Sequence, residues 1–164
     1  MKKIYYLLLV TLVAVTATSC RDRDWDSPYY IDDIVGSWES VYGYDGYTEY
    51  DILGYDVVRY DFYYNGTGRY SYYSHHNLYY YDFKWDTYSD KLYIRYSDGD
   101  VEYLYYGFDR YGYLLLSLDR RYTQYTAYRS TGTYWEQFKD NAVKQGMEVI
   151  REKPVVKSTA SAKE

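Results

Sequence analysis

The sequence predicts an all-β protein, an antiparallel up-and-down barrel of about eight strands followed by one C-terminal α-helix. From Gly36 to Arg129, short aromatic or aliphatic runs alternate with turn residues at the spacing typical of a sandwich or barrel. Tyrosine, a good strand former, occurs 30 times. Helical periodicity begins only after residue 132. The alternation does not decide between a closed barrel, an open curved sheet and a sandwich, although about eight strands can close into a barrel.

The clearest hairpin joins residues 57–64 to 69–73 across Asn65-Gly66-Thr67-Gly68, because Asn and Gly tolerate the positive φ of a tight turn. Alternate residues of a strand share one face. We expect the following side chains to face the interior and to line any ligand cavity: Tyr60, Phe62, Tyr64, Tyr70, Tyr72, Tyr81, Phe83, Trp85 and Tyr96. The opposite faces also carry tyrosines, at Tyr63, Tyr73, Tyr80, Tyr93 and Tyr113. This second set is covered by the helix or a partner, or forms an exposed binding patch.

The remaining strands are expected at 36–44, 48–53, 79–86, 91–97, 101–108, 113–118 and 122–129. Asp98-Gly99 is a strong signal for the hairpin between 91–97 and 101–108. Leu114, Leu116 and Leu118 form the most hydrophobic stripe, which is predicted to face the core.

The C-terminal segment predicts a helix over residues 133–152, and a disordered tail over 154–164. Thr133 to Glu136 fits a capping box, in which the two side chains satisfy backbone N–H groups of the first turn. The apolar residues at helical spacing are Trp135, Phe138, Ala142, Val143, Met147 and Ile150. Pro154 disfavours helix in the residue before it and should end the segment.

The first 19 residues have the basic start, short apolar run and small-residue end of a secretory signal peptide. Ala17-Thr18-Ser19-Cys20 resembles the lipobox of bacterial lipoproteins, which implies cleavage before Cys20 and acylation of this only cysteine. Residues 20–33 are polar and are expected to form a tether. We therefore expect an outer-membrane lipoprotein whose anchor faces the periplasm or the cell surface, with residues 34–153 as its β domain.

The order of motifs in residues 34–130 resembles the lipocalin-like lipoproteins common in Bacteroidetes. The resemblance rests on Ile34-Val35-Gly36-Ser37-Trp38, FYYNGTGRYSY, FKWDTYSDKLYIRYSDGDVEYLYY, LLLSL and the final TAYR. It implies a lipocalin-like barrel that carries or senses a small ligand. It also implies a structural pair in which Arg129 of the last strand stacks on Trp38 of the first.

The residues that usually perform catalysis are scarce in this chain. Cleavage of the signal would remove Lys2 and Lys3 and lower the formal charge from −5 to −7, which opposes nucleic-acid binding. His75-His76 lacks further ligands at metal-binding spacing. Asp98 and Asp100 flank a hairpin glycine, so turn formation explains this pair of carboxylates. We therefore expect no enzyme activity, metal or cofactor, and a tyrosine-rich surface that binds a small hydrophobic or glycan ligand. The alternative is an accessory protein that docks another envelope protein through its aromatic face.

Overall fold

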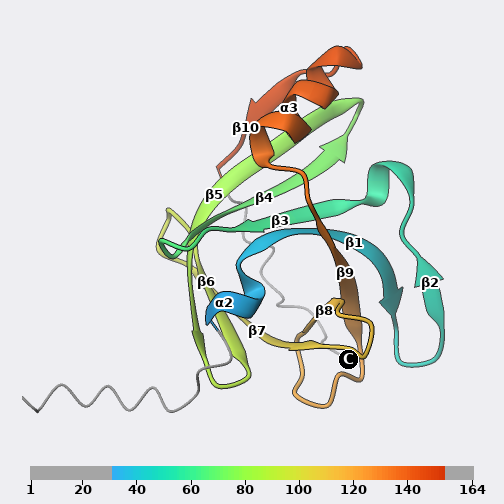
Figure 1. The fold of residues 1–164 in the computed structure, drawn as a ribbon, viewed down its shortest axis with the longest axis vertical. Helices are drawn as coiled ribbons and strands as arrows, with labels where there is room; N and C mark the ends of the chain where they lie inside the picture. Colours follow the sequence, from blue (N-terminus) through green and yellow to red (C-terminus); the bar gives the residue numbers. More distant parts are fainter. Residues whose placement is uncertain (1–30, 154–164) are drawn as a thin grey trace, which may run out of the picture.

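The computed structural model describes residues 31–153, and Figure 1 shows their arrangement. The predicted signal peptide 1–19, the lipidation site Cys20, most of the tether 20–33 and the tail 154–164 lie outside the described residues. None of the helices within residues 31–153 is long and apolar enough to span a membrane.

Eight antiparallel strands close into a barrel, as the strand pattern predicts. In chain order they are β1 (Gly36–Tyr44), β3 (Val58–Phe62), β4 (Thr67–Ser74), β5 (Asn77–Tyr88), β6 (Lys91–Arg95), β7 (Val101–Phe108), β8 (Leu114–Ser117) and β9 (Tyr125–Thr131). Each pairs with its neighbour in sequence, and β1 pairs with both β3 and β9. The pairing of β5 with β6 completes the ring. The sequence left closure undecided, whereas the pairing decides it.

The barrel core is formed by the inward side chains of all these strands. Its buried members are Ile34, Trp38, Tyr60, Phe62, Phe83, Trp85, Leu92, Ile94, Leu104, Tyr106, Leu114, Leu116 and Tyr128. Ile34 comes from α2 (Ile31–Ile34), the short helix just before β1. The Trp38 indole N–H donates to the Ile34 carbonyl oxygen at 2.8 Å. This bond ties α2 to the start of the first strand.

A second apolar cluster lies outside the barrel, where α3 (Trp135–Lys144) covers the β4–β5 hairpin (Figure 1). Its buried residues are Leu78, Trp135, Ala142 and Met147, with Tyr73, Tyr80, Phe138 and Val149 packed against them. Tyr80 contacts Trp135 with ring centroids 5.0 Å apart, and Tyr73 contacts Phe138 at 5.9 Å. The helix therefore covers Tyr73 and Tyr80, two of the outward tyrosines.

The predicted helix over 133–152 is too long. The helix ends at Lys144, and Gly146 follows it with φ +80°. The Gly146 N–H donates to the Val143 carbonyl oxygen, and the Met147 N–H donates to the Ala142 carbonyl oxygen. These two bonds form the Schellman motif that terminates many helices. The chain then forms β10 (Val149–Arg151), parallel to the first part of β5. At the other end Tyr134 is the N-cap and makes no side-chain cap hydrogen bond, so the predicted capping box is also wrong.

The segment predicted as a strand over 48–53 contains β2 (Glu49–Asp51), which pairs only with β1 and lies at the side of the barrel (Figure 1). The 3₁₀-helix η1 (Gly54–Asp56) leads from β2 into β3. The β3–β4 turn falls at Tyr63 to Gly66, slightly earlier than expected, because Thr67 and Gly68 already belong to β4. The hairpin at Gly99 is confirmed, with φ +98°.

Candidate functional site

A chain of tyrosine rings lies on the inner face of β3, β4, β5 and β9. Tyr60 contacts Tyr70 with ring centroids 4.8 Å apart and Tyr128 at 5.6 Å. Tyr70 contacts Tyr81 at 5.0 Å, and Tyr81 contacts Tyr96 at 5.7 Å. Of the predicted lining residues, the structure brings together Tyr60, Phe62, Tyr70, Tyr72, Tyr81, Phe83, Trp85 and Tyr96.

Two carboxylates reach these rings. The Tyr96 hydroxyl donates to Glu102 Oε2 at 2.5 Å, and the Tyr72 hydroxyl donates to Glu152 Oε2 at 2.5 Å. Glu102 of β7 pairs with Ile94, a fully buried core residue, so both side chains face inward. The sequence analysis missed Glu102. The sequence did carry a signal for it: Glu102 lies two residues before Leu104, and alternate residues of a strand share one face, here the core face.

Burial and the negative charge of Glu102 hold several of these tyrosines in the neutral form. Burial, and then Glu102, raise the pKa of Tyr70 to about 12. Burial, followed by the neighbouring tyrosines and Glu102, raises the pKa of Tyr60 well above its usual range. The pKa of Tyr128 is raised in the same direction by burial, then by Tyr70 and Glu102. At neutral pH the site therefore combines uncharged rings with a nearby carboxylate.

A cavity of about 410 Å³ opens at one end of the barrel, and we call it the mouth cavity. Its inner wall is formed by Tyr60, Tyr128, Leu104, Leu116 and Glu102, and Tyr50 of β2 stands at the rim. Further lining residues are Tyr44, Asp45, Ser117, Leu118, Asp119, Gln124, Tyr125 and Thr126. Every charged residue in this lining is acidic. The cavity joins the end of the tyrosine chain to solvent.

Tyr50 reaches the mouth because its partner in β1 has no side chain. Gly43 pairs with Tyr50, and a Cβ at Gly43 would overlap the Tyr50 ring. The Tyr50 side chain is 50% exposed, so its ring remains available to a ligand. On the same β1–β2 hairpin, Tyr47 is 91% exposed and does not line the mouth cavity.

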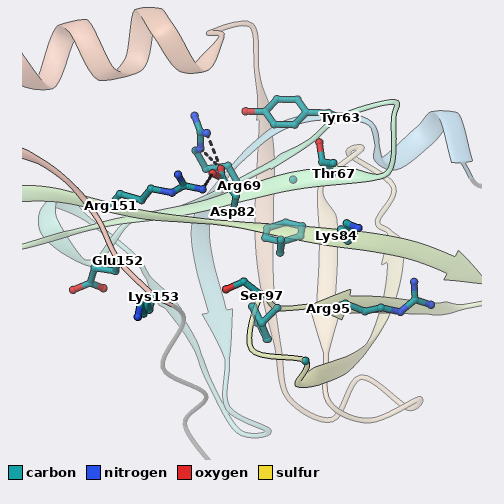
Figure 2. A pocket seen from close by; sticks show the side chains of 14 residues that line it. Tyr63, Thr67, Arg69, Asp82, Lys84, Arg95, Ser97, Arg151, Glu152 and Lys153 are labelled. Atoms are coloured by element: carbon teal, nitrogen blue, oxygen red, sulfur yellow. Dashed lines mark hydrogen bonds and ion pairs between the residues drawn. The ribbon is translucent and has the colours of Figure 1, made fainter.

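A larger cleft of about 1040 Å³ lies beside β5, and we call it the flank cleft (Figure 2). It falls where β5 changes partners, from β10 at Leu78–Tyr80 to β6 at Lys84–Tyr88. Figure 2 shows Arg69 and Arg151 converging on Asp82, and their ion pairs measure 2.6 and 2.9 Å.

The other charged residues that line the flank cleft are Lys84, Arg95, Glu152 and Lys153. Lys84, Arg95 and Lys153 are exposed and therefore well solvated. Among the described residues, seven of the fourteen that line the flank cleft are charged, against three of the fourteen that line the mouth cavity. We therefore take the mouth cavity as the better candidate site.

Two predicted inward residues face solvent. Tyr64 was expected to line the interior but lies in the β3–β4 turn with its side chain 77% exposed, because β3 ends at Phe62. Leu118 was expected to continue the leucine stripe but is 68% exposed, because β8 ends at Ser117. In both cases the strand stops before the alternation does.

The predicted stacking of Arg129 on Trp38 does not form. In the β1–β9 pair Trp38 lies opposite Ser130, whereas Arg129 lies opposite Glu39. Adjacent strand residues point to opposite faces, so Arg129 faces outward, where it is exposed. The Trp38 ring contacts Phe108 instead, with centroids 5.8 Å apart.

The outward tyrosines that α3 does not cover are partly exposed. Tyr42, Tyr113 and Tyr125 form a ring cluster on the barrel's outer surface, with centroids 6.0 and 6.3 Å from Tyr42. Tyr44 and Tyr111 extend this cluster, which we call the outer tyrosine cluster. On β6 and β7, Tyr93 contacts Tyr103 at 5.2 Å.

The two histidines of the chain lie together in a turn. His75 and His76 occupy the β4–β5 turn with φ of 47° and 63°, the loop position that the sequence indicated. No group of three His, Cys, Asp or Glu side chains in these residues is placed to hold a metal ion. The chain matches no family model and no curated protein sequence.

Proposed function

We propose that the protein is a non-catalytic, lipocalin-like envelope lipoprotein that binds a small ligand in its mouth cavity. The observation that carries this proposal is the cavity of about 410 Å³ walled by Tyr60, Tyr128, Leu104 and Leu116. Small-molecule sites typically measure roughly 300–1,000 Å³ and combine apolar and aromatic walls with a few polar groups. The mouth cavity has a volume in this range, and tyrosines and leucines line it together with acidic, amide and hydroxyl side chains.

The class of ligand follows from the wall. Tyrosine rings offer apolar faces to a hydrocarbon or to the C–H face of a sugar, and they lose little entropy on binding because they are rigid. A small hydrophobic or glycan ligand therefore suits the site. Acylation of Cys20 would hold the barrel at the outer membrane, where such compounds pass.

The proposal is tested with the uncharged fluorescent probe N-phenyl-1-naphthylamine and a panel of small aromatic alcohols, aromatic amines and oligosaccharides, titrated against the purified protein. The wild-type protein should bind at least one compound saturably. Tyr50→Ala should weaken binding severalfold, because it removes the rim of the mouth cavity. Tyr47→Ala is the matched control on the same hairpin and should bind as the wild type does.

Two outcomes would count against the proposal. One is that no compound binds at millimolar concentration. The other is that Tyr47→Ala and Tyr50→Ala weaken binding equally, which would place the compound on the outside of the hairpin.

The outer tyrosine cluster favours a second candidate function, docking onto another envelope protein. Tyr111 is 69% exposed, and its ring lies 6.4 Å from that of Tyr113. A photo-crosslinking amino acid at position 111 in intact cells should give one discrete adduct with an envelope protein, whereas the same group at Tyr134, on the α3 side, should not. Equal adducts from both positions, or none, would reject this function.

A further inference from the structure

We infer that the ligand of the mouth cavity carries a positive charge, that is, a protonated amine or quaternary ammonium joined to an apolar body. This inference rests on the proposed function and adds the charge of the ligand to it. It is carried by the position of Glu102, by the rings around it and by the charge of the whole rim.

Glu102 is placed to receive a cation. It lines the mouth cavity together with the buried Tyr60 and Tyr128. One carboxylate oxygen, Oε2, accepts the Tyr96 hydroxyl at 2.5 Å. A carboxylate has a second oxygen and about four acceptor sites in total, so Glu102 can accept N–H bonds from a ligand without losing Tyr96. Charge-assisted bonds of this kind are stronger than those between neutral groups.

The rings supply the second element of a cation site. Tyr60 and Tyr128 meet edge to face, with centroids 5.6 Å apart and planes at 70°, so their surfaces form a corner in the cavity wall. Tyr50 provides a third ring at the rim. Cations are attracted to the faces of aromatic rings, and the attraction grows when water is excluded. A corner of tyrosines beside a carboxylate recognises an ammonium group better than a neutral one.

The rim of the mouth cavity is negatively charged, like Glu102. Asp45 accepts backbone N–H bonds from Tyr47 and Thr48 at 2.9 Å each, and these bonds lower its pKa. Asp119 accepts the Thr123 hydroxyl at 2.6 Å, and that bond and neighbouring backbone bonds lower its pKa. Both carboxylates are thus ionised at neutral pH, and no Lys or Arg of residues 31–153 lines the mouth cavity. The entrance attracts cations and repels anions.

The flank cleft gives an internal contrast. Five of its seven charged lining residues are basic, and Glu152 there accepts the Tyr72 hydroxyl at 2.5 Å, as Glu102 accepts that of Tyr96. The two glutamates therefore have the same hydrogen-bond role and differ in the cavity that they line. Glu152 is the matched control for Glu102.

The test compares three phenylalkyl probes of similar size, 2-phenylethylamine, 2-phenylethanol and phenylacetate, titrated at neutral pH by calorimetry against residues 31–164 in 50 mM salt. The wild-type protein should bind the amine at least tenfold more tightly than the alcohol, and the carboxylate most weakly. Glu102→Gln should remove this preference, and Glu152→Gln should keep it.

The outcomes distinguish failure of the inference about charge from failure of the proposed binding function. If the wild type binds amine and alcohol equally, the inference fails and the binding function stands. If none of the three probes binds, both fail. If Glu152→Gln removes the preference as Glu102→Gln does, the charge acts from the flank cleft and the inference is wrong. The order of the three wild-type affinities decides the inference even if Glu102→Gln does not fold.

Discussion

At the scale of single residues, the least expected feature is an ion pair buried on the outside of the barrel. Arg59 and Asp61 are each 1% exposed, and Arg59 donates to both carboxylate oxygens of Asp61, at 2.7 and 3.1 Å. Arg59 also bonds Glu39 at 3.1 Å and the Thr133 carbonyl oxygen, and its guanidinium lies 4.5 Å from the Phe138 ring centroid. The pair thus joins β1 and β3 to the start of α3.

Arg59→Ala should lower the free energy of unfolding by about 3–5 kcal/mol, because it leaves the Asp61 charge buried without its partner. Arg129→Ala is the control. Arg129 lies on the other side of Glu39 in the sheet but is exposed, so its loss should change stability by less than about 0.5 kcal/mol. Urea denaturation measures both, and equal losses would contradict a special role for the buried pair.

A glycine in β4 is required by packing rather than by backbone conformation. A Cβ at Gly68 would overlap the Phe83 ring and lie 2.9 Å from the Asp61 carbonyl oxygen. Gly68→Ala should therefore cost about 1–3 kcal/mol through displacement of Phe83 in the core. Gly132→Ala, where a Cβ meets nothing within 4 Å, should be close to neutral in the same thermal or urea measurement. The prediction is wrong if the two variants have the same stability.

At the scale of elements, α3 and β10 act together on the part of β5 that extends past the barrel. Arg69 lies between the Trp135 and Tyr80 rings, 4.4 and 4.7 Å from their centroids, and pairs with Asp82. β10 adds a parallel strand to the same segment. The outer face of the hairpin is covered in this way, which explains why aromatic residues occur on both faces of β4 and β5.

Trp135→Ala should cost about 3–5 kcal/mol, the usual range for removing a buried tryptophan. It should also raise the hydrogen-exchange rates of β10 relative to those of β8, because β10 depends on α3 and the hairpin alone. Tyr134→Ala, next to it but 81% exposed, should change stability by less than about 0.5 kcal/mol. Equal protection of β10 in both variants would show that α3 does not hold it.

At the scale of the whole molecule, the tyrosines make the barrel sensitive to alkali. Burial raises the pKa of Tyr60, Tyr70, Tyr81, Tyr96 and Tyr128. In the unfolded chain a tyrosine loses its proton near pH 10. Above that pH the unfolded state binds fewer protons than the folded one, so the stability must fall as the pH rises.

We expect unfolding between about pH 10 and pH 12, with tyrosine absorbance at 295 nm and loss of circular dichroism changing together. Tyr70, with its pKa at about 12, alone accounts for a loss of about 2–3 kcal/mol by the end of this interval. In Tyr70→Phe the stability should decline less steeply over the same interval. Gradual ionisation without unfolding would contradict the prediction.

Of the nine side chains predicted to line a cavity, only Tyr60 lines the mouth cavity, although most of the nine do face the barrel core. Alternation placed Tyr60, Tyr70 and Tyr81 together, because period two alone decides which face a residue occupies. Alternation failed at Tyr64 and Leu118, since it does not show where a strand ends. The pairing of Arg129 with Trp38, which the family resemblance implied, failed because Arg129 lies opposite Glu39 and faces outward. Glu102 had the inward spacing, yet its partner Tyr96 lies six residues earlier, just after the end of β6.

The sequence by itself determined the β class, the order of the hairpins and the inward set of aromatic residues, because these depend on local turn chemistry and alternation. Only the tertiary structure decided that β5 pairs with β6 to close the barrel, that Gly146 ends α3 early, and that Arg59 and Asp61 are buried. These features depend on contacts between residues far apart in the chain. The mouth cavity belongs with them, because its wall is assembled from β2, β3, β7, β8 and β9.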